Sequence, residues 1–160
     1  KENERIEVFT KHIVDEYEAE LNLLDESSGT RKLFGLLPFI AKSLLMGTTL
    51  VIDELDAKIH PVLLKYLIMT FSNMDKNKKG AQLIFTSHDL STMNSDVFRR
   101  DEIWFVEKDK NGVSELYSLS DYIIEDENGN AKKVRNDATY NKDYLTGRYG
   151  AIPVIEEFIR

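Results

Sequence analysis

Residues 49–61 read Thr-Leu-Val-Ile-Asp-Glu-Leu-Asp-Ala-Lys-Ile-His-Pro. The first four are apolar or β-branched, which predicts a central parallel strand buried on both faces. This strand ends at two adjacent carboxylates, Asp53 and Glu54. Pro61 is typical of the first turn of a helix, and the apolar residues after it share one helical face. The stretch therefore predicts a strand followed by a helix, which is the repeating unit of parallel α/β folds.

The segments before this stretch predict a hairpin and a long helix. Apolar residues alternate over residues 4–14 and 17–24, which is typical of two antiparallel strands. Between residues 33 and 44 they recur at i, i+3, i+4, i+7 and i+11, the spacing of a helix packed on a core. Ser27-Ser28 precede this helix as candidate N-caps. Pro38 lies inside the helical pattern and predicts a kink or a shorter first half.

The segments after residue 61 complete the predicted fold. Residues 82–86 and 102–106 are expected to form a second and a third strand, and Asn111-Gly112 predicts a hairpin turn before residues 113–117. Strands and helices that alternate with short connections predict an α/β fold, with a mostly parallel sheet, flanking helices and a C-terminal antiparallel hairpin. We expect a single domain over residues 1–160.

The last part of the chain carries weaker signals. Residues 126–130, Asp-Glu-Asn-Gly-Asn, predict a turn. Arg148-Tyr149 belong either to an effector contact or to a docked tail, and we favour the docked tail.

The composition excludes several classes of protein. The chain has 160 residues, of which 42% are hydrophobic and 31% are charged, as in a folded globular domain. It has no cysteine, which excludes disulfides and cysteine-bound zinc. Its apolar runs are too short or too interrupted to span a bilayer, and its first residues do not resemble a secretory signal. We therefore expect a cytoplasmic protein without a membrane partner.

The net charge of −7 does not favour binding of nucleic acid through charge alone. A local basic groove, or another part of a longer protein, could still contact nucleic acid. The one basic cluster, at residues 76–79, is expected to be a solvated loop.

Polar residues follow two of the predicted strands. Asp53-Glu54 end the first, and His88 comes shortly after the second. Ligands of parallel α/β sheets bind beyond the carboxyl ends of the strands. One carboxylate there could hold Mg²⁺ at the phosphates of a nucleotide while the next polarises a water. The alternatives are solvated acids that cap the next segment and a partly buried structural histidine.

Residues 26–31, Glu-Ser-Ser-Gly-Thr-Arg, lie at the start of the predicted long helix. Small hydroxyl residues and a glycine at a helix N-terminus suit a phosphate. The alternative is an ordinary N-cap.

Four motifs resemble, in order and spacing, those of the ABC-type ATPases. Ser27-Ser28-Gly29-Thr30-Arg31 is similar to the signature motif, and residues 50–54 are similar to Walker B. Leu55-Asp56-Ala57 is similar to the D-loop, and Thr86-Ser87-His88 to the switch histidine. Together with residues 147–153, these details most resemble the ABC/SMC-like AAA ATPases of the abortive-infection group, phage-defence relatives of the overcoming-lysogenisation-defect proteins. The resemblance extends over most of the chain.

The resemblance implies roles within one subunit for three of these residues. Asp53 would hold Mg²⁺ through water, and Glu54 would be the catalytic base. His88 would contact the γ-phosphate of ATP.

The resemblance implies that the remaining motif residues act between subunits. Asp56 would lie at the seam of a dimer. Ser27, Ser28 and Gly29 would form the signature that meets the γ-phosphate of ATP bound to the partner subunit, although Ser28 stands where ABC transporters usually carry glycine.

The sequence contains no Gly-x-x-x-x-Gly-Lys-Ser/Thr motif, which supplies most phosphate contacts in P-loop ATPases. We therefore expect this chain to be the C-terminal part of an ABC-type P-loop ATPase, inactive alone, with the P-loop portion upstream. The expected cofactors are ATP and Mg²⁺. The expected partners are a second copy bound through ATP and a toxin or nuclease effector, in anti-phage defence or a toxin system. The alternative function is a non-catalytic module, derived from an ATPase, for dimerisation or regulation.

Overall fold

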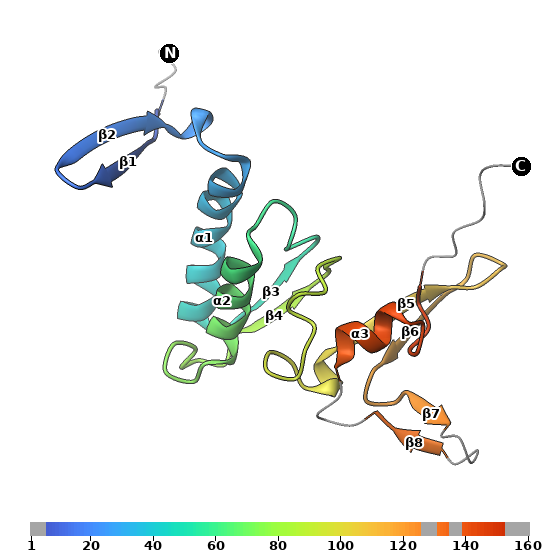
Figure 1. The fold of residues 1–160 in the computed structure, drawn as a ribbon. Helices are drawn as coiled ribbons and strands as arrows, with labels where there is room; N and C mark the ends of the chain where they lie inside the picture. The colour runs from blue at the N-terminus through green and yellow to red at the C-terminus, as the bar shows by residue number, and fades with distance from the viewer. Residues whose placement is uncertain (1–5, 126–130, 135–138, 153–160) are drawn as a thin grey trace, which may run out of the picture. The chain divides into compact units, whose positions relative to one another are not determined.

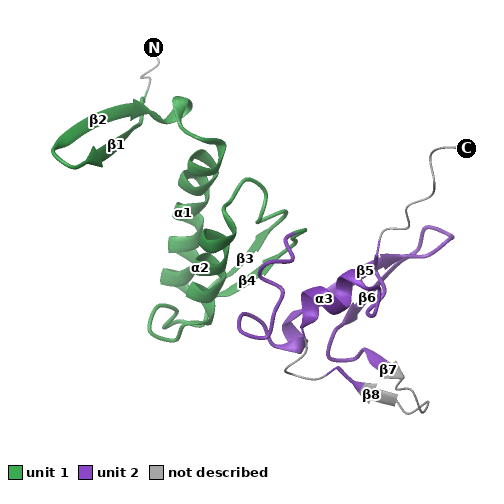
Figure 2. Cartoon of the chain, in the orientation of Figure 1, with its two compact units in different colours: residues 1–88 green, residues 89–160 purple. Residues whose placement is uncertain are grey.

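The computed structural model describes residues 6–125, 131–134 and 139–152. Its contacts divide the chain into two compact units, residues 1–88 (unit 1) and residues 89–160 (unit 2) (Figures 1 and 2). The single domain expected over residues 1–160 stays a prediction, because two compact units can belong to one domain. No helix in the described ranges is long and apolar enough to cross a membrane.

Unit 1 begins with the predicted antiparallel hairpin. Strands β1 (Phe9–Val14) and β2 (Tyr17–Asn22) pair from Phe9↔Asn22 to Val14↔Tyr17. The turn between them has two residues, and Asp15 adopts a φ of 53° there. Aspartate tolerates this left-handed conformation better than most residues, which explains its place in the turn. A short 3₁₀ helix, η1 (Leu23–Asp25), follows the hairpin.

The long helix is also confirmed. Helix α1 (Ser28–Met46) begins at Ser27, whose Oγ accepts a hydrogen bond from the N–H of Thr30 at 3.1 Å. It ends at Gly47, which adopts a φ of 70°. Helix α1 continues through Pro38, so the prediction of a shorter first half is wrong. Helix formation is cooperative, and a helix capped at both ends tolerates one missing backbone hydrogen bond.

Two strands of unit 1 form a parallel pair. Strand β3 (Thr49–Ile52) pairs with β4 (Gln82–Phe85), with Ile52 opposite Phe85. Helix α2 (Pro61–Ser72) connects them and buries Leu64, Leu67 and Ile68, as its sequence pattern predicts. Helix α1 contacts β3 and helix α2 contacts β4. The parallel pairing and the connecting helix of the predicted α/β fold are therefore present.

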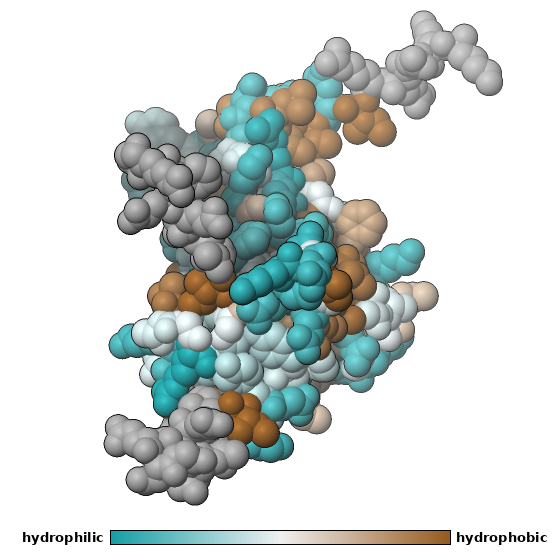
Figure 3. Space-filling model, turned by 90° about the vertical axis from the view of Figure 1, so that its right-hand side faces the viewer, coloured by the Kyte–Doolittle hydropathy of each residue, from teal (hydrophilic) through white to brown (hydrophobic). Residues whose placement is uncertain are grey.

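The predicted burial of β3 on both faces is wrong for the described structure. Every second residue of the pair is exposed, with Val51 71% and Ile84 57% exposed. The alternate residues, Leu50 and Leu83, are half-buried. Because side chains alternate between the two faces of a sheet, the helices cover one face and leave the other bare. Exposed hydrophobic side chains also appear as brown areas on the surface in Figure 3.

The third predicted strand does not join this parallel pair. It is β5 (Trp104–Lys108) of unit 2, which pairs antiparallel with β6 (Ser114–Ser118). The predicted turn between these strands is confirmed, with Gly112 at a φ of 81° and Asp109 Oδ1 accepting from the N–H of Val113 at 2.7 Å. The C-terminal antiparallel hairpin is thus present, and the parallel sheet of the described residues is smaller than expected.

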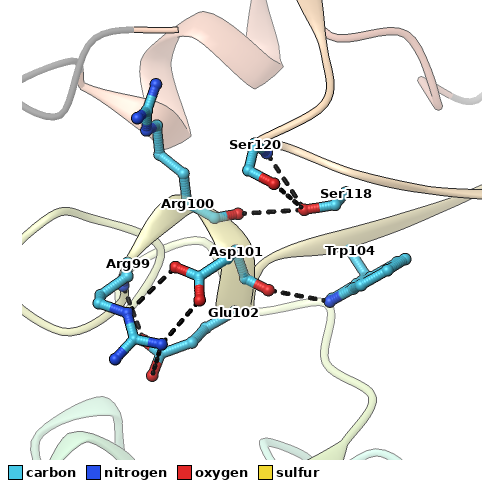
Figure 4. Close-up of polar contacts among 7 residues, drawn as sticks. All are labelled: Arg99, Arg100, Asp101, Glu102, Trp104, Ser118 and Ser120. Atoms are coloured by element: carbon cyan, nitrogen blue, oxygen red, sulfur yellow. Dashed lines mark hydrogen bonds and ion pairs between the residues drawn. The ribbon is translucent and has the colours of Figure 1, made fainter.

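Strand β5 begins two residues later than predicted because residues Arg100–Glu102 form a 3₁₀ turn, η2 (Figure 4). The carboxylate of Glu102 accepts a hydrogen bond from the N–H of Arg99 at 2.7 Å, and the indole N–H of Trp104 donates to the carbonyl of Asp101 at 3.1 Å. These bonds hold the backbone in a turn just before the strand.

Unit 2 has an aromatic core, to which Phe105 and Tyr149 belong, and contains three elements that the sequence did not predict. These are β7 (Ile123–Glu125), β8 (Ala131–Lys133) and α3 (Tyr140–Leu145). Phe105 stacks on Tyr144 with ring centroids 5.5 Å apart. The predicted turn at residues 126–130 lies outside the described residues.

The segment around Tyr149 is docked on this core. Tyr149 is fully buried and donates a hydrogen bond to Asp143 Oδ2 at 2.9 Å, while its carbonyl accepts from the hydroxyl of Tyr117 at 2.6 Å. Arg148 is exposed and pairs with Asp143 at 3.3 Å. The burial of Tyr149 agrees with the prediction of a docked tail.

Gly35 lies inside α1 and Gly47 follows its last residue. Replacing each of them by alanine should change the stability of the protein in opposite directions. A Cβ at Gly47 would lie 2.6 Å from the carbonyl oxygen of Lys79, and its left-handed backbone costs an alanine about 1–2 kcal/mol. A Cβ at Gly35 would meet nothing within 4 Å. We expect Gly47→Ala to lower the free energy of unfolding and Gly35→Ala to raise it by about 0.5–1 kcal/mol, measured by urea unfolding. Equal effects of the two changes would contradict the geometry at Gly47.

Alkaline pH should destabilise unit 2. Burial raises the pKa of Tyr117 to about 12, with the charge of Glu107 adding to the effect, and burial also raises the pKa of Tyr149. A raised pKa means that the folded state favours the neutral phenol, so this stability is present below about pH 10 and is lost as the pH rises towards about 12. Thermal unfolding followed with tyrosinate absorbance should show this loss. A Tyr117→Phe variant should lose less over the same range, and an equally steep loss would contradict this assignment.

Candidate functional site

The carboxyl ends of β3 and β4 meet at the side chain of Thr86. The pairing of Ile52 with Phe85 places Asp53 and Thr86 beside each other as the two strands end. The Thr86 hydroxyl donates a hydrogen bond to Asp53 Oδ1 at 2.5 Å, and the N–H of Thr86 donates to the carbonyl of Ile52 at 3.1 Å. The first carboxylate after β3 is therefore fixed by the first residue after β4.

The backbone of Glu54 is held in a strained conformation. Its φ is 47°, which is uncommon for a residue with a Cβ. Its N–H donates to Thr86 Oγ1 at 2.8 Å, and its carbonyl oxygen accepts from Lys32 Nζ at 2.6 Å and from the N–H of Ala57 at 3.1 Å. These bonds use only the backbone, so the carboxylate of Glu54, an exposed residue, is left to other interactions. Strain of this kind is concentrated at functional sites.

Asp56 connects the loop after β3 to the loop after β4. Its Oδ1 accepts a hydrogen bond from the N–H of His88 at 3.3 Å. Leu55, next to it, is 1% exposed and donates its N–H to the carbonyl of Thr86 at 3.1 Å. His88 itself is exposed. Both loops are therefore joined at residues 55–56.

The start of α1 packs closely against the same loop. A Cβ on Gly29 would lie 2.5 Å from the carbonyl oxygen of Lys58, closer than real Cβ contacts, so only glycine fits here. Lys58 has a φ of 65°. An open hollow at this contact is lined by Ser28, Arg31, Lys32, Ala57 and Lys58.

The structure thus gathers Asp53, Glu54 and His88 at the ends of two strands, as the sequence pattern predicted. It adds Asp56, which the pattern did not place there, through the bond from the N–H of His88. Ser27, Ser28 and Gly29 do not join that cluster. They form the N-terminus of α1, which reaches the loop after β3 through Gly29 and through the bond of Lys32 to Glu54.

Sequence reasoning missed the parts played by Thr86 and Lys32. Thr86 belongs to the motif that is similar to the switch histidine, and the resemblance gives it no role of its own. Its signal is its position directly after β4, opposite the residue that follows β3. Lys32 has no such signal, because its bond to a backbone carbonyl 22 residues away depends on the packing of α1.

The arrangement suits a divalent cation bound together with phosphates. No group of three or more His, Asp or Glu side chains that could enclose a metal occurs in the part of the chain that the structure describes. Mg²⁺ does not need such a group, because it is usually held by one or two carboxylates, phosphate oxygens and water. A carboxylate can accept about four hydrogen bonds or ligand contacts, and Thr86 uses one of those of Asp53. Asp53 therefore fits this ion.

A comparison with protein families agrees with this geometry. The family described as "AAA domain, putative AbiEii toxin, Type IV TA system" matches residues 2–94, more than half of the chain. The match includes all seven site residues expected from the sequence, from Ser27 to His88, and ends before the aromatic residues of the core of unit 2. A comparison with curated proteins gives no match. The chain belongs to this family of AAA domains, of the ABC-type ATPase class associated with abortive infection.

Proposed function

We propose that this chain is the ATP-hydrolysing part of a dimerising ABC-type ATPase, and that it carries the signature, Walker B, D-loop and switch histidine. The observation that supports this most is the junction at Thr86, where one hydroxyl bonds both the Asp53 carboxylate and the Glu54 backbone. A general base must be held in place while its carboxylate remains accessible to water. Glu54 meets both conditions, since its backbone is fixed and the residue is exposed.

The residues around this junction have distinct roles in the proposal. Glu54 takes the proton of the attacking water. Asp53 holds Mg²⁺ through water, and the ion when bound neutralises charge on the phosphate oxygens. His88 follows β4 on the loop bonded to Asp56 and contacts the γ-phosphate. Charge develops at that phosphate during hydrolysis, so this contact acts mainly on the transition state.

A segment outside the printed sequence supplies the P-loop in this proposal. The sequence has no P-loop motif, and the bare face of the β3–β4 pair exposes Val51 and Ile84. Parallel sheets are almost always covered on both faces. A P-loop segment that adds strands to this pair and helices to its bare face would complete both the sheet and the phosphate site.

The signature acts across a dimer in this proposal. Ser27, Ser28 and Gly29 lie at an N-terminus that presents backbone N–H groups, and they are separate from the acids at the ends of β3 and β4. A phosphate bound by the partner's P-loop would meet them there, with Asp56 at the seam. The family's description supports a role in a toxin or abortive-infection system, where the state of the nucleotide would control a toxin or nuclease effector.

Replacing Glu54 by glutamine tests the catalytic role. In the complete protein with its P-loop segment, Glu54→Gln should lower kcat by about a hundredfold or more while ATP still binds, because an amide cannot accept the proton of water. The backbone bonds of residue 54 do not involve its side chain, so the fold should persist. Phosphate release and ATP binding by calorimetry measure the two effects.

Glu115→Gln is the matched control, since Glu115 is an exposed acid on β6 of unit 2. It should leave kcat unchanged. If Glu54→Gln also leaves kcat unchanged, the base is another residue, and the non-catalytic module becomes the better explanation.

Mixing two inactive variants tests the signature across the dimer. Ser27→Arg should leave ATP binding to each subunit intact but block dimerisation and turnover, because a bulky cation would fill the space in front of the helix N-terminus. In a heterodimer of Ser27→Arg and Glu54→Gln subunits, one composite site carries both changes and the other carries neither. Ser27→Arg alters both composite sites of a homodimer but only one of a heterodimer, so the heterodimers that form should show measurable hydrolysis.

Two further variants at Ser27 distinguish the effect of a bulky side chain from the effect of losing the N-cap. Ser27→Thr keeps the hydroxyl that accepts from Thr30 and should retain turnover. Ser27→Ala removes the cap at a cost of about 1 kcal/mol and should weaken the helix without blocking the dimer. If purified heterodimers stay inactive, either both sites must act together or the signature does not serve the partner's ATP.

A further inference from the structure

The carboxylate of Glu26, next to the signature serine, is held by hairpin β1–β2. Glu26 Oε1 accepts a hydrogen bond from the hydroxyl of Thr10 and lies 2.6 Å from Nε2 of His12. The side chain of Glu26 is 7% exposed. A carboxylate so enclosed is costly unless it is paired and hydrogen-bonded, and the hairpin supplies both partners.

Thr10 and His12 are arranged for this contact by the register of the hairpin. They are two residues apart on β1, so their side chains point to the same face. Thr10 Oγ1 also lies 3.1 Å from the carbonyl of Leu21, its partner on β2. The pKa of the Glu26 carboxyl is held below its usual range, first by the bond from Thr10 and then by the contact with His12. The folded chain thus favours the charged form that both groups can bind.

Hydrogen bonds also attach the linker between β2 and α1, residues 23–27, to both the hairpin and the helix. The N–H of Leu23 donates to the carbonyl of Val8 at 2.9 Å, which attaches the linker to the hairpin. Arg31 Nη1 donates to the carbonyl of Leu24 at 3.2 Å, which attaches it to the first turn of α1. Glu26 follows both attached residues, Leu23 and Leu24, and lies directly before Ser27. A displacement of the hairpin would therefore be passed to the N-cap of α1.

We propose that Thr10, His12 and Glu26 are positioning residues that couple hairpin β1–β2 to the signature at Ser27. The hairpin holds Glu26, Glu26 fixes the backbone before Ser27, and Ser27 sets the direction of the N–H groups at the start of α1. The consequence for ATP hydrolysis rests on the proposed function of Ser27, whereas the coupling itself can be measured without ATP.

Amide hydrogen exchange tests the coupling. The N–H of Thr30 donates to Ser27 Oγ and the N–H of Arg31 to the carbonyl of Ser27, so both amides report on the N-cap. We expect His12→Ala and Glu26→Ala to speed exchange at these amides about tenfold. Unchanged exchange at both amides would overturn the proposal.

The matched control is Lys11→Ala. Lys11 lies on the same strand but on the opposite face, where it forms an exposed ion pair with Glu18 at 2.7 Å. Exposed ion pairs contribute little to stability. Lys11→Ala should therefore leave exchange at Thr30 and Arg31 unchanged. Faster exchange in this variant as well would mean that the hairpin is loosened as a whole, and the specific coupling would be wrong.

Kinetics of the complete protein test the consequence for hydrolysis. His12→Ala should lower kcat about tenfold with less than a twofold change in the KM for ATP, because the signature is completed only in the closed dimer. His12→Gln should restore most of the activity, since its amide N–H₂ can donate to Glu26 from a position near that of Nε2. Equal changes in kcat and KM, or no rescue by glutamine, would overturn the positioning role.

Failure of the proposed function and failure of the proposed coupling would give different results. If the complete wild-type protein does not hydrolyse ATP, the proposed function is wrong, and the exchange experiment alone decides the coupling. If exchange at Thr30 and Arg31 rises in His12→Ala while kcat stays the same, the coupling exists but does not position a catalytic group, and the proposal is overturned.

Discussion

The hydroxyl of Thr86 is the contact on which the candidate site depends. It donates to Asp53 Oδ1 and accepts from the N–H of Glu54, so one side chain fixes two consecutive residues of another strand's end. A hydroxyl has one donor and two acceptor positions, which lets it serve both. The bonds require the register that places Ile52 opposite Phe85. The position of the acids is therefore a consequence of how β3 and β4 pair, and so is the left-handed backbone of Glu54.

Much of unit 1 could be predicted because its signals are local. The helical spacing of α1 and α2, the alternation in β1 and β2, and the apolar run of β3 each lie within a few residues of sequence. Strand β5 shows where such signals fail. Trp104 and Val106 are exposed and Phe105 is buried, which is the alternation of a half-covered antiparallel strand. Because all three are apolar, the sequence looks like a strand buried on both faces, and its partner cannot be identified from it.

The candidate site also has features that could be predicted from local sequence and features that could not. The acids after β3 and the histidine after β4 were predicted together, because the carboxyl ends of neighbouring parallel strands lie at one edge of the sheet. The bond from Lys32 to the carbonyl of Glu54 and the contact of Gly29 with Lys58 were not. Both depend on how α1 packs against the loop after β3. Packing between segments is set by the whole core, and a single sequence shows it only indirectly.

The bare face of the β3–β4 pair links stability to nucleotide binding in the proposed ATPase. Covering a valine or isoleucine fully contributes about 1.5–3 kcal/mol, and Val51 and Ile84 are mostly exposed here. A P-loop segment that covers this face would gain that energy. The same segment would bring the phosphates to the strand ends where Asp53 and Glu54 lie. Folding onto the sheet and forming the ATP site would then be one event, so loss of packing at Val51 or Ile84 would weaken ATP binding without any change in a residue that touches the nucleotide.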